Sequence, residues 1–220
     1  MQDNEIDWIE RWQDGRIGFH QESTNDVLMR HWPAVVKDSK CDVLVPLCGK
    51  SKDMLWLLER GHRVVGVELC SLAVEGFFHE NNVDYSVEER GPYTAYVGRN
   101  TEFEITLLVG DFFAIEPDIA GRFMAVYDRA AFVALPPSKW SAYAAAVTRV
   151  MSDEASGLVL TFEYPQAERD GPPFSVSYDD VATALQTGWS VDLLETLNLA
   201  DRNRWELSRL QEPVIHIRRA

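Results

Sequence analysis

Two short apolar runs separated by an amphipathic segment dominate the first half of the chain. Residues 42–46 read DVLVP, which is too short and too rich in β-branched valine for a helix, and residues 63–67 read RVVGV. Between them, apolar residues recur at helical spacing over 54–58, after Ser51, a residue type that caps helices. Gly61 ends this helix. The pattern therefore predicts a β-α-β unit, whose crossover makes the two strands parallel.

The rest of the chain continues this alternation of strands and helices. Two helices before the first strand and a hairpin over 85–98 are additions to it. We expect one domain, 1–220, with a helical lid over 1–40 and an α/β core over 41–220, built as a three-layer sandwich around a seven-stranded, mostly parallel sheet whose last strand is antiparallel. The further strands are expected at 103–109, 123–127, 158–163, 189–194 and 214–218, and the further helices at 4–13, 27–35, 71–80, from 138 onward, and at 178–186.

An acidic residue ends the second strand of the β-α-β unit. Glu68 follows Gly49 by nineteen positions (68 − 49). In doubly wound sheets an acid about twenty residues after the glycine turn accepts hydrogen bonds from both ribose hydroxyls of a nucleoside. The alternative is a solvated acid at a strand end. Position and residue type together favour the ribose interpretation.

The turn before Glu68 is unusual for a dinucleotide site. VPLCGKS contains one glycine, whereas the G-x-G-x-x-G fingerprint has three, and Leu44 stands where a P-loop needs its first glycine. A pyrophosphate needs close backbone approach along the whole turn, which Leu47 and Lys50 would obstruct. A nucleoside without phosphates needs less room. The segment therefore points to S-adenosylmethionine.

Composition limits the possible partners. The chain has 220 residues, 46% of them apolar, and a net charge of −14. The excess of acids argues against nucleic acid, and the sequence contains no apolar stretch of about eighteen residues that would span a membrane. Three cysteines without a C-x-x-C pair predict neither disulfides nor a metal site. With no signal-peptide pattern at the start, we expect a cytoplasmic monomer acting on a small molecule.

Polar and aromatic residues gather where the predicted strands end. Glu68, Asp111 with Phe112, and Arg129 each follow a different strand. The carboxyl ends of parallel strands share one edge of a sheet, where ligands bind in open α/β folds. This placement and the strand count fit the fold of class I methyltransferases.

The chain resembles the thiopurine S-methyltransferase family, and its bacterial members in particular. The matching segments follow the family's order along nearly the whole chain. They are W-x-x-x-W followed by GRIGFHQ (within 8–21), VPLCGKSKDMLWL (45–57), GHRVVGVELC (61–70), GDFF (110–113), YDRAAFVALP (127–136) and GPPFSV (171–176). The resemblance implies methyl transfer from S-adenosylmethionine to the sulfur of thiopurines or related aromatic thiols, and in some relatives to selenium or tellurium species.

The resemblance also implies roles for individual residues. Arg129 matches a residue that contacts the cofactor and lies near the acceptor, and we take it as the candidate catalytic residue. Which of Arg202 and Arg204 supplies a second arginine on the acceptor side is open. The other residues implied to bind the cofactor are Trp8, Trp12, Phe19, Leu47, Glu68, Asp111 and Phe112.

Several alternatives accompany these assignments. Arg129 could instead form a structural salt bridge with Asp128 or another nearby acid. His20 could act as an acid or base, although fixing its loop by hydrogen bonds is the simpler role. Trp32 is expected in the core. At the level of function, the alternatives are a nicotinamide-dependent oxidoreductase and a non-catalytic protein that binds S-adenosylmethionine.

Overall fold

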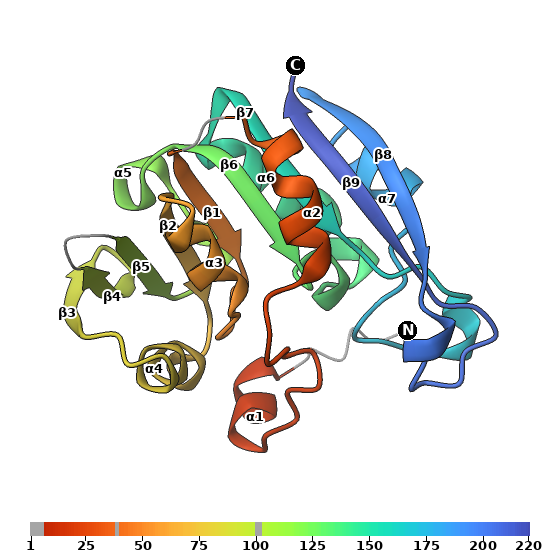
Figure 1. Ribbon diagram of the computed structural model, residues 1–220, viewed down its shortest axis with the longest axis horizontal. Coiled ribbons are helices and arrows are strands. Elements are labelled where there is room, and N and C mark those ends of the chain that lie inside the picture. Colours follow the sequence, from red (N-terminus) through yellow and green to blue (C-terminus); the bar gives the residue numbers. More distant parts are fainter. Residues whose placement is uncertain (1–6, 38–39, 100–102) are drawn as a thin grey trace.

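One mixed β-sheet organises the molecule. The computed structural model describes residues 7–37, 40–99 and 103–220, and in this part of the chain nine strands form a sheet of order β3-β4-β5-β2-β1-β6-β7-β9-β8 (Figure 1). The strands are β1 (Asp42–Pro46), β2 (Arg63–Glu68), β3 (Tyr85–Arg90), β4 (Tyr93–Arg99), β5 (Glu104–Val109), β6 (Phe123–Arg129), β7 (Met151–Leu160), β8 (Trp189–Asn198) and β9 (Gln211–Arg219).

Helices connect most of these strands. The β-α-β unit predicted from the apolar runs is present, with β1 and β2 joined by α3 and paired in parallel. The α-helices are α1 (Trp8–Gln13), α2 (Asp26–Val35), α3 (Asp53–Glu59), α4 (Ser71–Glu80), α5 (Pro117–Ala120), α6 (Trp140–Val150) and α7 (Tyr178–Ala184). The 3-10 turns are η1 (Phe112–Ala114), η2 (Phe132–Ala134), η3 (Pro137–Lys139), η4 (Gln166–Glu168) and η5 (Ala200–Arg202).

The order of the sheet reverses at β1. This strand pairs in parallel with β2 on one side and with β6 on the other. From β1, the strands β2 to β5 therefore extend the sheet on one side, and β6 to β9 extend it on the other. The crevice at the carboxyl ends of such a pair of strands is the usual ligand site of an open α/β sheet.

The expected number of strands is corrected from seven to nine. The predicted hairpin over 85–98 forms β3 and β4, and β4 pairs antiparallel with β5, so the hairpin extends the main sheet. The sheet is also less parallel than expected. Among the described pairings, those of β7 with β9 and of β8 with β9 are antiparallel as well. The antiparallel direction of the last strand is confirmed, and four of the eight pairings are parallel.

Two apolar cores lie on opposite faces of the sheet. One face carries α2, α3 and α4, whose buried side chains include Trp32, Leu57 and Phe77. The other face carries α5, α6 and α7, with Tyr143 and Val181 among the buried side chains. This arrangement gives the three layers predicted from the sequence (Figure 1).

The two N-terminal helices have different environments. Helix α2 packs against the sheet through Val27, Leu28, Trp32 and Val35, and it continues through Pro33 without interruption. Helix α1 buries none of its residues and lies at the carboxyl ends of the central strands (Figure 1). The expected start of this helix at 4–6 lies outside the described residues. Only the segment that begins with α1 is therefore placed to cover a site.

Candidate functional site

A large cavity opens at the carboxyl ends of the parallel strands. Its volume is about 520 Å³, within the range typical of small-molecule sites. Segments far apart in sequence contribute to its wall, namely α1 with the loop after it, the ends of β1, β2, β5 and β6, the proline-rich segment near 172, and 199–212. All predicted site residues line it, and these are Trp8, Trp12, Phe19, Leu47, Glu68, Asp111, Phe112 and Arg129.

Glu68 presents an oriented carboxylate to the cavity. Its Oε2 accepts a hydrogen bond from the backbone N–H of Gly49 at 2.9 Å, and its Oε1 accepts one from Cys70 N–H at 3.0 Å. The side chain is buried, and burial raises the pKa of the carboxyl despite these backbone hydrogen bonds. Each oxygen keeps a lone pair for a further donor. The carboxylate can therefore accept two hydrogen bonds from a ligand.

The turn between β1 and α3 has a strained backbone beside Glu68. Leu47 has φ +46° and Gly49 has φ +53°, and the left-handed region is uncommon for a leucine. A Cβ atom on Gly49 would approach the Trp12 ring to 3.1 Å, so the indole lies directly against this glycine. Strain of this kind concentrates at ligand sites, where the surrounding structure maintains it. The single glycine of the turn is thus needed for an aromatic neighbour.

Three aromatic rings form a group at the edge of the cavity. Phe19 packs edge-on against Trp8 at 5.9 Å and against Trp12 at 5.5 Å between ring centroids. These contacts connect α1 to the loop that follows it. Two arginines attach the same loop to the core, since Arg204 donates to the Gly18 carbonyl at 2.5 Å and Arg129 to the Phe19 carbonyl at 3.5 Å.

Asp111 and Phe112 follow β5 at the same edge. The Asp111 carboxylate caps the 3-10 turn η1 by accepting from Phe113 N–H at 2.9 Å, and Tyr93 donates to the Asp111 carbonyl. Phe112 is buried and packs against Tyr143 at 5.3 Å between ring centroids. Packing against the core therefore fixes Phe112, while both Asp111 and Phe112 line the cavity.

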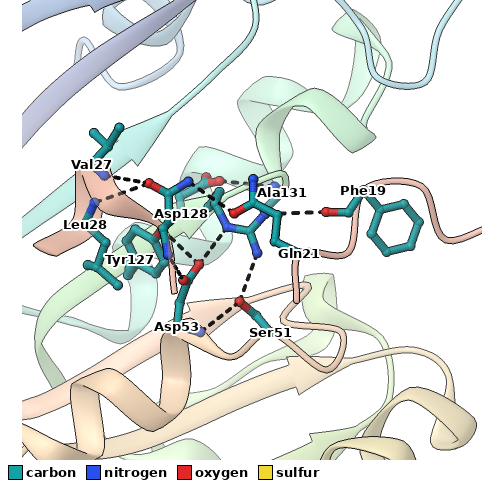
Figure 2. Close-up of polar contacts among 11 residues, drawn as sticks. Phe19, Gln21, Val27, Leu28, Ser51, Asp53, Tyr127, Asp128 and Ala131 are labelled. Carbon is teal, nitrogen blue, oxygen red and sulfur yellow. Dashed lines mark hydrogen bonds and ion pairs between the residues drawn. The ribbon is translucent and has the colours of Figure 1, made fainter. Parts of the chain in front are cut away.

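Ser51, Asp53 and Tyr127 belong to a buried polar network (Figure 2), which Arg129 joins through its guanidinium. The Nε of Arg129 donates to Oδ2 of Asp53 at 2.6 Å, and a terminal nitrogen donates to Ser51 Oγ at 2.9 Å. Tyr127 donates to the same Asp53 oxygen at 3.0 Å, and Asn25 N–H donates to the other at 2.8 Å. The salt bridge weighed as an alternative for Arg129 thus exists, with Asp53 as the partner.

Asp128, the other acid proposed as a partner, points elsewhere. It accepts from the Tyr143 hydroxyl at 2.7 Å and from the backbone N–H groups of Ala131 and Phe132. It is fully buried, and burial raises its pKa to about 6. Asp128 therefore holds the backbone after β6, while Arg129 remains at the cavity wall.

His20 lines the cavity without the hydrogen bonds expected of it. Its Nε2 is buried and has no hydrogen-bond partner among the described residues, with the nearest Glu22 oxygen at 3.6 Å. Burial and the charge of Lys50 lower the pKa of the imidazole. The loop is fixed instead by the backbone of His20, whose N–H donates to Ile17. The simpler role proposed for the side chain is thus wrong.

The cavity concentrates positive charge in an acidic protein. Acids outnumber Lys and Arg by 35 to 21 in the chain, yet six arginines line the cavity against the three acids Glu68, Asp111 and Glu212. The arginines are Arg11, Arg16, Arg129, Arg169, Arg202 and Arg204. The arrangement favours an anionic or electron-rich ligand on the side where these guanidinium groups gather.

Sequence reasoning missed two of the acids in this region. Asp53 looks in sequence like an acid in the first turn of a helix, a common placement that needs no partner. Glu212 is the second residue of β9, between Gln211 and Pro213, and no motif draws attention to it. Its sequence neighbours form no apolar run around it, so nothing in the sequence indicated that this acid is buried.

The architecture agrees with solved methyltransferase structures. A Burkholderia thailandensis 1,6-didemethyltoxoflavin-N1-methyltransferase with bound S-adenosylhomocysteine superposes with a TM-score of 0.63 at 15% identity, over 97% of this chain and 86% of that one. Magnesium protoporphyrin IX methyltransferase from Synechocystis PCC 6803 gives 0.63 at 13% identity, over 95% and 91%. These likenesses show that the chain has the fold of class I methyltransferases.

Comparison of sequences identifies the family. The model of the thiopurine S-methyltransferase family matches residues 3–220. Thiopurine S-methyltransferase of Bordetella petrii is 45% identical over 85% of this chain and 83% of that protein. The protein of the same name from Pseudomonas fluorescens strain Pf0-1 is 42% identical over 96% and 97%. The chain belongs to the thiopurine S-methyltransferase family.

Proposed function

We propose that this enzyme transfers the methyl group of S-adenosylmethionine to the sulfur of thiopurines or related aromatic thiols, with selenium or tellurium species as further acceptors. One observation carries the proposal. A single cavity joins a carboxylate suited to a ribose, Glu68, with an apolar and arginine-rich wall suited to an electron-rich aromatic ring. The family relationship supports the same reaction.

The residues on one side of the cavity fit the cofactor. Glu68 offers free lone pairs next to Gly49, where the backbone can approach a ligand closely. Leu47 and Phe112 offer apolar surface to an adenosine, and Trp12 offers an aromatic face to the sulfonium, a contact worth about 0.5–2 kcal/mol. When bound, S-adenosylmethionine supplies an electrophilic methyl group.

The opposite side fits an aromatic acceptor. Phe162, Pro172 and Pro173 line it together with apolar residues that follow β6. Of the two candidate arginines, Arg204 already donates to the Gly18 carbonyl and stacks on Trp205 at 5.3 Å. Within the described residues the Arg202 side chain makes no hydrogen bond, and it lines the cavity. We therefore assign the acceptor-side role to Arg202.

Positioning is the main contribution asked of these residues. Methyl transfer needs an in-line approach of the acceptor sulfur, and holding the two reactants in that geometry supplies roughly 7–11 kcal/mol of barrier reduction. Arg129 is suited to this task because Asp53 and Ser51 fix its guanidinium. Residues 8–21 form the proposed lid and exclude water. The rest of the expected lid, α2, packs in the core.

The remaining expectations about partners belong to the same proposal. None of the helices in the described part of the chain is long and apolar enough to cross a membrane. The net charge of −14 supports the absence of a nucleic-acid partner. We propose a cytoplasmic monomer. Sedimentation of the purified enzyme as a dimer would contradict the last point.

A turnover assay tests the proposed reaction. The purified enzyme is given S-adenosylmethionine with a labelled methyl group and a panel of acceptors: a thiopurine, an aromatic thiol, a selenol and tellurite. We expect labelled S-methyl product from the thiopurine. Binding of S-adenosylhomocysteine without turnover of any acceptor would instead favour a non-catalytic binding protein. Binding of a nicotinamide dinucleotide would favour the oxidoreductase.

A further inference from the structure

Glu212 is a buried acid without a partner in the described part of the chain. It lies on β9, only 8% exposed, and its carboxylate makes no hydrogen bond or ion pair within the described residues. Buried carboxylates are normally paired, because an uncompensated charge away from water is costly. Glu68, the other buried acid of the cavity, follows this rule, since it accepts backbone hydrogen bonds from Gly49 and Cys70.

The same side chain lines the cavity. Its oxygens are not completely buried, so they retain some contact with the cavity space. Leu210 and Leu160 also line the cavity, and Arg129 and Arg202 are near enough for their charges to act on the Glu212 carboxylate. Glu212 is thus placed beside the two arginines assigned to the acceptor rather than beside Glu68.

The acceptor carries a proton that must leave. A thiopurine exists in water largely as a thione with a ring N–H. When its sulfur is methylated, the new S–CH₃ bond forms, the bond between the methyl group and the sulfonium sulfur breaks, and the ring N–H must lose its proton to give a neutral thioether. A base that accepts this proton during transfer lowers the barrier, typically by a rate factor of roughly 10²–10⁴.

We infer that Glu212 is a catalytic base that binds the N–H or S–H of the methyl acceptor and takes up its proton as the sulfur is methylated. This inference rests on the proposed S-methyltransferase function and specifies the acceptor. The preferred acceptor presents a donor hydrogen next to its sulfur. The carboxylate becomes a carboxylic acid, and the charges balance: a cationic cofactor, a neutral thione and an anionic Glu212 yield three neutral species. Solvent then removes the proton.

The electrostatic surroundings agree with this role. Burial raises the pKa of Glu212, and Glu195 on β8 raises it further, while Arg129 on β6, Arg202 on η5 and Arg30 on α2 lower it. A carboxylate with a raised pKa is a stronger base, so it accepts the proton of the acceptor more readily. Because the base must be ionised to act, turnover of a thione falls as the pH falls through this pKa.

The test compares two acceptors in the wild type and in Glu212→Gln. One acceptor is a thiopurine in its thione form, and the other is an aryl thiol whose electron-withdrawing substituent keeps it ionised over the pH range used. We expect Glu212→Gln to lower kcat/KM for the thione roughly 10²-fold and to remove the acidic limb of its pH profile. The kcat/KM for the ionised thiolate should not fall, since that acceptor has no proton to lose and the variant removes a like charge from the cavity wall.

Controls separate this inference from the proposed function. Asp192→Asn removes an exposed acid of β8 that pairs with Arg218 outside the cavity, and it should leave both acceptors unaffected. Equal losses for both acceptors in Glu212→Gln, or no loss for either, would overturn the base role. If Glu212→Gln does not fold, the wild type still decides, because an acidic limb must appear with the thione and be absent with the thiolate. A wild type that methylates neither acceptor contradicts the proposed function itself.

Discussion

At the scale of single residues, the site contains two buried carboxylates with different roles, one facing a ligand and one bound to the protein itself. Glu68 is held by backbone N–H groups and keeps lone pairs for a ligand. Asp53 is only 1% exposed, and its carboxylate accepts hydrogen bonds from other groups of the protein. The donors are the backbone N–H of Asn25, the Tyr127 hydroxyl and Arg129. Substitution at Glu68 is therefore expected to change binding, and substitution at Asp53 to change stability.

Replacing Glu68 should weaken cofactor binding. We expect Glu68→Ala to raise the dissociation constant of S-adenosylhomocysteine at least tenfold, about 1.4 kcal/mol, because both ribose hydroxyls lose their acceptor. Isothermal titration calorimetry measures this directly. Glu59→Gln, which changes an exposed acid on α3, serves as the control. An unchanged dissociation constant in Glu68→Ala would refute the ribose assignment.

Arg129 requires a design that separates stability from catalysis. Arg129→Ala leaves the Asp53 carboxylate buried without its charge partner, which should cost roughly 3–5 kcal/mol of unfolding free energy. The double variant Asp53→Asn/Arg129→Ala removes that charge and should regain part of this stability. Methyl transfer should stay low in both variants, because neither contains the guanidinium.

Urea denaturation and a turnover assay, run on both variants, check this expectation. Recovery of activity together with stability in the double variant would assign Arg129 a purely structural role.

At the scale of elements, α1 is the least anchored part of the site. It buries no residue, and it is held by aromatic contacts and by the loop that Arg129 and Arg204 attach to the core. Elements with few buried contacts open locally at low free-energy cost. A ligand beneath α1 would supply the contacts that it lacks.

Hydrogen exchange tests this behaviour. On binding S-adenosylhomocysteine, the amides of residues 8–21 should exchange more slowly, since the ligand restrains the segment from below. The amides of α6, which packs in the core away from the cavity, should exchange at an unchanged rate. Equal protection of both segments would indicate global stabilisation and would contradict a lid.

The elements also show what the sequence can and cannot predict. Periodicity predicted β1, α3 and β2 because each has one strong pattern over its whole length. It could not predict that the hairpin extends the main sheet, because β3 is exposed at five of its six residues. Its pattern of polar and apolar residues therefore does not indicate what the hairpin packs against. The pairing of β4 with β5 is set by the tertiary structure and cannot be predicted from the periodicity of the hairpin.

The same limit applies to the site. Family motifs located Glu68 and Arg129, but the pairing of Arg129 with Asp53 joins positions 76 apart. Glu212 follows no motif, and its importance comes from its lack of a hydrogen-bond or ion-pair partner in the part of the chain that the structure describes. Both facts exist only in three dimensions.

At the scale of the whole molecule, overall charge and local charge have opposite signs. The chain carries −14, while arginines dominate the cavity wall. Charges within a few ångströms of a ligand act more strongly than distant ones, which salt screens over about 10 Å at 0.1 M. The cavity therefore attracts an anionic acceptor despite the negative surface.

Salt dependence tests this balance. At saturating S-adenosylmethionine, raising ionic strength from about 0.01 M to about 0.5 M should increase KM for an ionised aryl thiolate, because salt weakens its attraction to the arginines. KM for a neutral thione should change little and serves as the control. A KM for the thiolate that decreases with salt would show that the overall negative charge controls its approach.

The arginines that fasten the loop after α1 bind main-chain carbonyls, at Gly18 and Phe19. Every amino acid carries that oxygen. Apart from Gly18, where a Cβ would approach the Arg204 guanidinium to 3.2 Å, the loop can consequently exchange side chains without losing its two attachments. The side chains of this loop line the cavity, so substitutions there can alter which ligands fit while both attachments persist.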